Sequence, residues 1–138
     1  MSKDDLIKQV GRNELVEFLG IKIQVAEADR VVLTMPVTSK VHQYMGIMNG
    51  GVSMYLAETA ASIGAVASAD LTKFAPVGLE INGNHLRAVS KGILTVEATP
   101  IYPGRTVNVW LINITNEKEK LIFTGRITIL MQKKPAVG

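Results

Sequence analysis

The sequence predicts an α+β domain in which a highly curved antiparallel sheet wraps around one long helix. Two patterns carry this prediction. The run from Val52 to Ala69 has the length of a helix and is apolar on almost every side, as in helices enclosed by other elements. Much of the remaining chain consists of short segments in which apolar and polar residues alternate, as they do in strands. A helix this apolar does not suit the outside of a sheet, so we expect the sheet to enclose it.

Each predicted element follows from its own local pattern. Apolar residues recur at helical spacing near the N-terminus, where Asp4 and Asp5 suit a helix start. Alternation then predicts a hairpin, an irregular segment leads to the long helix, and four further alternating segments predict an antiparallel meander. The predicted ranges are 1–18 for the N-terminal helix, 21–26 and 30–35 for the hairpin, 50–69 for the long helix, and 77–87, 92–101, 106–114 and 121–131 for the meander.

Punctuating residues separate these elements. Residues 70–76 end with a proline and break the long helix, and the Tyr102-Pro103-Gly104-Arg105 sequence is typical of a tight turn. The polar segment 116–120 predicts a hairpin loop, and 132–138 are expected to form a flexible tail.

Length and composition narrow the class of protein. The 138 residues suit a single domain over 1–138, and 47% of them are hydrophobic but only 5% aromatic, so the core is expected to be aliphatic. The net charge of +3 is modest, and no cluster of basic residues exceeds Lys133-Lys134, which does not favour nucleic-acid binding. The apolar stretches are interrupted too often for a membrane span, and the first residues lack the layout of a secretory signal. A cytoplasmic location is therefore expected.

The absence of cysteine excludes disulfides, thiolate nucleophiles and cysteine-based metal sites. With two histidines in the whole sequence, a metal site is not expected either.

One ionisable residue stands out in the long helix. Glu58 is the single carboxylate of its apolar run, and a charge in such surroundings needs a partner or a task. The Asn49-Gly50-Gly51 sequence at the helix start exposes backbone N–H groups at the positive end of the helix dipole. A carboxylate combined with such a pocket suits chemistry on a carbonyl group. In the structural alternative, the two glycines form only a tight turn, and Glu58 reaches solvent or pairs with a basic residue.

Helix geometry separates these two features within one chain. Gly50 precedes Glu58 by more than two turns, so its N–H and the carboxylate are roughly 12 Å apart along the axis, too far to act on one carbonyl. A dimer with two antiparallel helices would set Glu58 of one protomer near Asn49 and Gly50 of the other, and would create two identical sites. Ser62 lies one turn after Glu58 on the same face.

The residues around this helix resemble those of a known family. The shared pattern covers most of the chain, from about residue 15 to 131. It resembles the hotdog-fold acyl-CoA thioesterases, in the branch of the phenylacetate-pathway, 4-hydroxybenzoyl-CoA and 1,4-dihydroxy-2-naphthoyl-CoA thioesterases. The residues that carry it are Gln43, Asn49-Gly50-Gly51, Glu58, Ser62 and the stretch Gly78-Leu79-Glu80-Ile81-Asn82-Gly83-Asn84-His85-Leu86-Arg87.

This resemblance implies a hotdog fold, a homodimer or a tetramer made of two dimers, and hydrolysis of acyl- or aroyl-CoA thioesters. It implies that Glu58 attacks the thioester carbonyl or activates a water, and that Gly50 donates its N–H to the developing oxyanion. Gln43 is then expected near the carboxylate or the thioester, and Ser62 beside the attacking water or Glu58. His85 is expected to approach the thioester or the pantetheine arm.

The remaining predicted site residues concern the substrate. Gly51 is assigned to substrate binding, and Arg87, Lys91 and Arg105 are candidates for the coenzyme A phosphates, with solvated strand-end charges as the alternative. Many relatives have histidine where this chain has Asn49, whose amide can donate a hydrogen bond but cannot transfer a proton. Coenzyme A is part of the substrate, so no separate cofactor is expected.

Other functions remain open from the sequence. The same fold suits a non-catalytic acyl-CoA-binding or regulatory module, and less readily a hydratase or dehydratase, whose usual motif spacing is absent. A purely structural dimer is the third alternative. The acyl group cannot be assigned from these residues.

Overall fold

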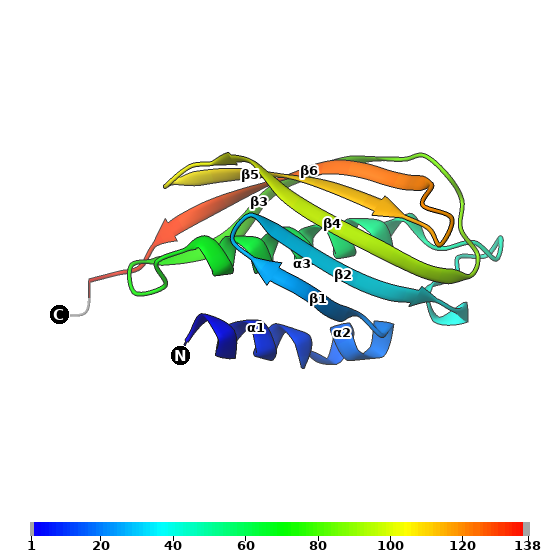
Figure 1. The fold of residues 1–138 in the computed structure, drawn as a ribbon, viewed down its shortest axis with the longest axis horizontal. Helices are drawn as coiled ribbons and strands as arrows, with labels where there is room; N and C mark the ends of the chain where they lie inside the picture. The colour runs from blue at the N-terminus through cyan, green and yellow to red at the C-terminus, as the bar shows by residue number, and fades with distance from the viewer. Residues whose placement is uncertain (1, 137–138) are drawn as a thin grey trace.

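The computed structural model describes residues 2–136. Six antiparallel strands form one sheet in the order β1-β2-β4-β5-β6-β3, and this sheet curves over the long helix α3 (Figure 1). The strands are β1 (Lys22–Glu27), β2 (Arg30–Val37), β3 (Phe74–His85), β4 (Gly92–Pro103), β5 (Val107–Thr115) and β6 (Leu121–Lys133). The helices are α1 (Lys3–Gly11), α2 (Glu14–Leu19) and α3 (Gly50–Ser68), with a short 3-10 turn η1 (Ser39–Val41) before α3. The predicted α+β architecture is confirmed.

The N-terminal segment forms two helices where the periodicity predicts one. Asn13 interrupts it, because its side-chain oxygen accepts the Leu15 N–H at 3.0 Å and so caps a new helix. Gly20 then ends α2 in the left-handed conformation, with φ of 73°. The first residue, which the prediction placed in this helix, lies outside the described residues.

The order of the strands differs from the predicted meander. β3 pairs with β6, while β4 pairs with β2 and β5, so β3 and β4 are not neighbours. β3 also begins at Phe74, within the predicted break, and contains Pro76. A proline is tolerated there because β3 lies at the edge of the sheet.

The last strand is longer than predicted because its end pairs with the early start of β3. Gln132 pairs with Ala75 and Lys133 with Phe74, so the first two residues of the predicted tail belong to β6. The final two residues of that tail lie outside the described part of the chain.

The core lies between α3 and the concave face of the sheet. Trp110 on β5 is 1% exposed and packs directly over Gly64, where an added methyl carbon would lie 2.3 Å from the indole ring. One face of α3 is therefore held very close to β5. The inward-facing core residues of the sheet are mostly aliphatic, as expected: Leu33, Met35, Leu94, Val96, Ile112, Ile114, Phe123, Ile127 and Ile129.

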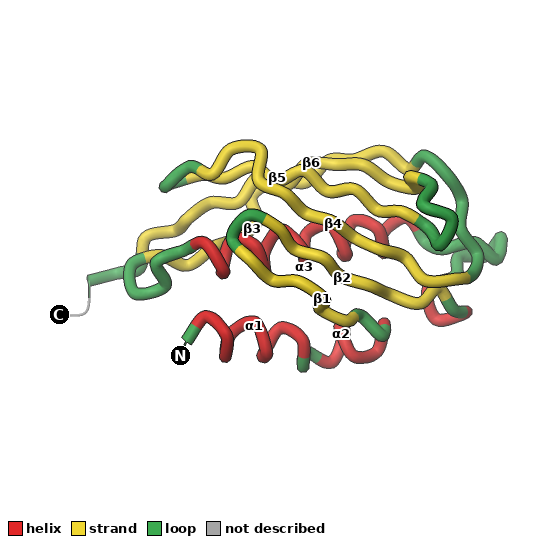
Figure 2. The backbone as a smooth tube through the Cα atoms, viewed as in Figure 1, coloured by secondary structure: helices red, strands yellow, loops and turns green. Residues whose placement is uncertain are grey.

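The sheet covers one face of α3 and leaves the opposite face partly open. One face of the helix is buried against the sheet, but Glu58 is exposed, and Tyr55, Thr59 and Ser62 are half-buried. Figure 2 shows α1 and α2 as separate helices beside β1, and they cover part of this second face. Within residues 2–136, no helix has both the length and the hydropathy that a membrane crossing requires.

Candidate active site

The N-terminus of α3 is held in a defined geometry. Asn49 caps the helix in an extended conformation, and its Oδ1 accepts the Gly51 N–H at 2.8 Å. The Asn49 N–H in turn donates to the Val41 carbonyl at 2.8 Å. Among the described residues, none accepts the Gly50 N–H. The N–H of Gly50 is therefore a free donor in this chain, whereas the N–H of Gly51 donates to Asn49.

A cavity of about 360 Å³ opens beside this free N–H. It brings together four predicted site residues: Gln43, Gly50, His85 and Arg87. The His85 imidazole lies against Gly50, because a methyl carbon added to Gly50 would be 2.8 Å from His85 Nε2. Gln43 Oε1 accepts the Met45 N–H within the loop that precedes α3.

His85 and Leu86, which line this cavity, both contact strand β6. The His85 ring packs on Phe123 with centroids 5.5 Å apart, and the Leu86 N–H donates to the Ile122 carbonyl at 2.8 Å. The end of β3 is therefore fixed on β6 at the point where it meets α3. This contact explains how His85, far from Gly50 in the sequence, reaches the helix N-terminus.

Glu58 and Ser62 lie in a different cavity. They line a space of about 270 Å³ together with Tyr55 and Thr59 from α3 and with residues of the N-terminal segment, Val10, Asn13 and Val16. Glu58 forms no ion pair or hydrogen bond within residues 2–136. The expectation of a buried carboxylate is wrong for the single chain, in which Glu58 reaches solvent and has no basic partner.

A close contact with β3 sets the position of the Glu58 carboxylate. A methyl carbon added to Gly78 would lie 2.4 Å from Glu58 Oε1, so the carboxylate rests on the glycine backbone. The β3–β6 register shifts between Gly78 and Glu80, which marks a β-bulge at this point. The strand is irregular where it meets the acid, as is common beside functional groups.

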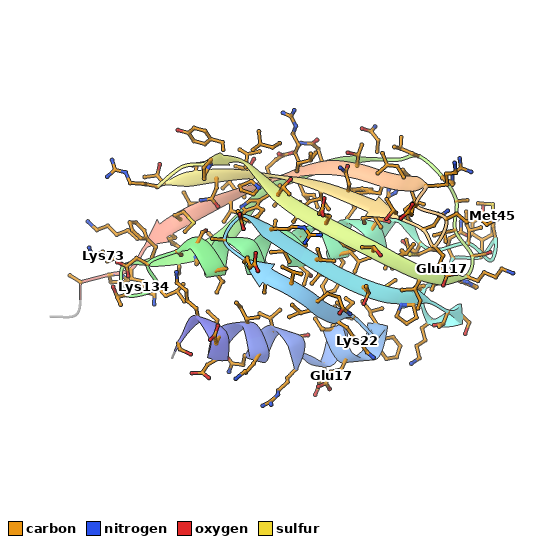
Figure 3. The ribbon with its side chains drawn as sticks, in the orientation of Figure 1. Glu17, Lys22, Met45, Lys73, Glu117 and Lys134 are labelled. Atoms are coloured by element: carbon orange, nitrogen blue, oxygen red, sulfur yellow. The ribbon has the colours of Figure 1, made fainter. Side chains whose placement is uncertain are left out.

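The other predicted site residues lie apart from both cavities. Arg105 lines a third cavity with Ser68 and Asp70, at the C-terminal end of α3, so this chain does not bring it to Gly50. Lys91 is exposed in the β3–β4 connection, directly after Ser90, whose carbonyl accepts from His42 Nε2 at 2.8 Å. Figure 3 shows Met45, from the loop before α3, at one end of the molecule and Lys73 at the opposite end.

Sequence reasoning missed two residues of the site. Ser53 is 2% exposed and lines the Gly50 cavity, and its position one turn after Gly50 was the available signal. Gly78 supports Glu58 only through the packing of β3 on α3, which no local pattern reports. Within residues 2–136, no three side chains of the metal-ligating types come together.

Comparison with known proteins places this arrangement in a family. The model of the thioesterase superfamily matches residues 45–123, which include the whole of α3. The 1,4-dihydroxy-2-naphthoyl-CoA hydrolase of Listeria monocytogenes is 46% identical over 120 residues, which cover 87% of this chain and 97% of that protein. The enzyme of the same name from Escherichia coli is 36% identical over 126 residues, with 90% of each chain covered.

Solved structures share the fold over almost the full length. A thioesterase variant of Pseudomonas aeruginosa superimposes with a TM-score of 0.88 at 31% identity, and covers 94% of both chains. A Staphylococcus aureus protein has a TM-score of 0.84 at 41% identity, over 88% of this chain and all of its own. Structures of that protein exist with one glutamate or one glutamine replaced by alanine, and these positions are as far apart as Gln43 and Glu58.

The hotdog fold expected from the resemblance is therefore confirmed, and so is the expectation that the chain is a thioester hydrolase. The chain belongs to the thioesterase superfamily.

Proposed function

We propose that this protein hydrolyses acyl- or aroyl-CoA thioesters to the free acid and coenzyme A, at sites shared between two protomers. One observation carries the proposal: the free N–H of Gly50 and the carboxylate of Glu58 line separate cavities of the same chain. Each cavity holds one half of what thioester hydrolysis needs. The names of the relatives from Listeria monocytogenes and Escherichia coli support coenzyme A thioesters as the substrate class.

Packing of two α3 helices about a two-fold axis would bring both groups into one site. Gly50 and Glu58 are roughly 12 Å apart along the axis of one helix. Antiparallel packing of two helices would place Gly50 of one protomer beside Glu58 of its partner. The exposed face of α3 supports this pairing, because it carries Glu58 and the half-buried Tyr55. The edge strand β3 supports it as well, since a strand of 12 residues pairs on one side only and exposes Leu79.

The chemistry then follows from the two groups. Glu58 either takes a proton from a water as it attacks the carbonyl carbon, or attacks that carbon itself and is released by water. In both routes the carbonyl oxygen gains negative charge, which the N–H of Gly50 at the positive end of the helix dipole stabilises. In the first route the carbon–sulfur bond breaks, coenzyme A leaves as a thiolate, and the proton that Glu58 took from the water passes to the sulfur. In the second route the same bond breaks as Glu58 forms an anhydride with the acyl group. Water then hydrolyses the anhydride to the free acid and the Glu58 carboxylate, and a proton of this water neutralises the thiolate.

The neighbouring residues take supporting parts in this proposal. Gln43 and His85 approach the thioester and the pantetheine arm from the Gly50 cavity, and Arg87 meets a phosphate. Ser62 holds the water or the carboxylate from one turn further along α3. Asn49 caps the helix through its side-chain oxygen, which accepts the N–H of Gly51, and its side-chain NH2 group donates to the thioester carbonyl.

Steady-state hydrolysis of a panel of coenzyme A thioesters, aliphatic and aromatic, tests this function. Glu58→Ala and the isosteric Glu58→Gln are expected to lower kcat by at least about a hundredfold, since both remove the proton acceptor and nucleophile. Glu58→Asp is also expected to lose most activity, because the shorter side chain misplaces the carboxylate. Glu17→Gln is a matched control, since Glu17 is exposed on α2 and Figure 3 shows it pointing away from α3.

Three outcomes would count against the proposal. Equal activity of the wild type and Glu58→Ala would remove Glu58 from the mechanism. Binding of thioesters by the wild type without turnover would support the non-catalytic alternative. A melting temperature that coenzyme A and its esters leave unchanged would support a purely structural role.

A further inference from the structure

Ser53 is a buried polar residue that the mechanism above does not use. Its side chain is 2% exposed, and within residues 2–136 no residue forms a hydrogen bond with its hydroxyl. Every fully enclosed side-chain nitrogen or oxygen of the described chain does have a hydrogen-bond partner. The Ser53 oxygen is therefore not fully enclosed, and the residue lines the cavity beside Gly50 and His85.

A serine in this situation is unusual. Serine hydroxyls inside helices commonly donate to a carbonyl of the preceding turn, as Ser68 does to Ala65 at 3.1 Å in the same helix. A fully enclosed hydroxyl without a partner costs roughly 1–3 kcal/mol, and the Ser53 hydroxyl avoids this cost because it opens to the cavity. The hydroxyl of Ser53 is thus left free at a place where an acceptor from outside the chain would satisfy it.

Helix geometry directs this hydroxyl toward the free N–H of Gly50. Residues three apart lie on the same face of a helix, and side chains lean toward the N-terminus. Ser53 follows Gly50 at this spacing and lines the same cavity. The two donors therefore lie on one face of α3 and line the same cavity.

We propose that the Ser53 hydroxyl is a second hydrogen-bond donor to the thioester carbonyl oxygen, beside the N–H of Gly50. This inference rests on the proposed thioester hydrolysis and adds a catalytic residue to it. The hydroxyl keeps its own proton throughout. It stabilises the negative charge that the oxygen gains when the carbonyl carbon is attacked, and this charge disappears when the carbon–sulfur bond breaks.

The variant Ser53→Ala tests the role. Removal of one such donor typically lowers kcat by about a hundredfold or more, with a smaller effect on KM, because the donor acts mainly on the developing charge. The same variant is expected to melt at the wild-type temperature or above it, because the lost hydroxyl had no partner in the chain. Lower activity without lower stability distinguishes a functional hydroxyl from a structural one.

Three further measurements sharpen the test. Ser68→Ala removes a hydroxyl from the same helix outside the cavity, and its kcat is expected to match the wild type. Ser53→Thr keeps the hydroxyl beside a cavity with room for a methyl group, and is expected to recover much of the activity lost in Ser53→Ala. An S-alkyl thioether of coenzyme A lacks the carbonyl oxygen, so its affinity is expected to be the same for the wild type and Ser53→Ala.

The outcomes separate this inference from the proposed function. Hydrolysis by the wild type together with a kcat of Ser53→Ala within about threefold of it would overturn the inference and leave the function intact. The inference would also be overturned if Ser53→Ala weakened binding of the thioether by the same factor as it lowered kcat. The variant would then have disturbed binding in general. A wild type that hydrolyses no coenzyme A thioester would overturn both.

Discussion

Glu58 owes its position to the absence of a side chain on the facing strand. Its carboxylate rests on Gly78, and a methyl carbon there would lie 2.4 Å from Oε1. Contacts that short do not occur between real atoms, so any side chain at residue 78 must displace the carboxylate. Because Glu58 has no hydrogen bond or ion pair in the described chain, this steric contact is what restricts it on the side of β3.

We therefore expect Gly78→Ala to lower kcat by about tenfold or more, since a misplacement of about 1 Å in a catalytic group has effects of that size. The fold is expected to persist, because the displaced group is an exposed side chain. A double-mutant cycle checks the cause: in a Glu58→Ala background, Gly78→Ala is expected to have no further effect on kcat. Additive losses would show that Gly78 acts on something other than Glu58.

Single residues were predictable where the sequence alone reports their chemistry. Glu58 stands out as a carboxylate in an apolar helix, and Gly50 stands out at the start of that helix. Ser53 and Gly78 do not stand out, because the burial of Ser53 and the contact of Gly78 with Glu58 depend on how β3 packs on α3. Burial of Glu58 was predicted wrongly for the same reason, since an apolar helix surface does not reveal which element covers it.

At the scale of elements, the packing of α3 on β5 holds the site together. Gly64 allows the helix to approach Trp110 so closely that a methyl carbon would lie 2.3 Å from the indole. Both residues are buried, and Trp110 is 1% exposed, so neither can move without opening the core. This contact fixes the height of α3 above the sheet, and with it the positions of Gly50 and Glu58.

Gly64→Ala is expected to destabilise the protein on the order of 1 kcal/mol or more. Overpacking a core costs about 1–3 kcal/mol, and the 2.3 Å approach to a buried indole favours the upper end of this range, above the gain of about 1 kcal/mol from replacing glycine by alanine in a helix. Urea denaturation followed by Trp110 fluorescence measures this at fixed protein concentration. Gly11→Ala is the matched control in α1, because its methyl would make an ordinary contact of 3.5 Å with Ile23. Equal stability of Gly64→Ala and the wild type would contradict this account of the packing.

The elements themselves were predictable to different degrees. The range of α3 follows from its long apolar run, and its start at Gly50 follows from the cap at Asn49. The division of the N-terminal helix was missed because Asn13 offers the chain a local cap that periodicity does not register. The start of β3 was missed because Pro76 is usual in a turn but is also tolerated on an edge strand.

At the scale of the whole molecule, strand order could not be derived from the sequence. Alternation of apolar and polar residues predicts a strand and its buried face, but it does not predict which strand lies next to it. The pairing of β3 with β6 rather than β4 leaves β3 at the edge of the sheet, beside Glu58. The same unpaired edge and the exposed face of α3 are the surfaces on which the proposed dimer depends.

The central claim is that each site takes Glu58 from one protomer and Gly50 from the other, and complementation between two inactive variants tests it. Glu58→Ala removes the carboxylate. Gly50→Pro removes the N–H at the first position of the helix, where proline is favoured and Asn49 is already extended. Gly50→Ala is its control, since it makes the same close approach to His85 but keeps the N–H.

Each variant alone is expected to be nearly inactive, and the two are then refolded together in equal amounts. Random pairing makes half of the dimers mixed, and one of the two sites in a mixed dimer has both wild-type groups. The account predicts recovery of about one quarter of the wild-type activity, measured with a thioester that the wild type hydrolyses. A co-refolded mixture that forms dimers and stays as inactive as its two components would contradict the shared site.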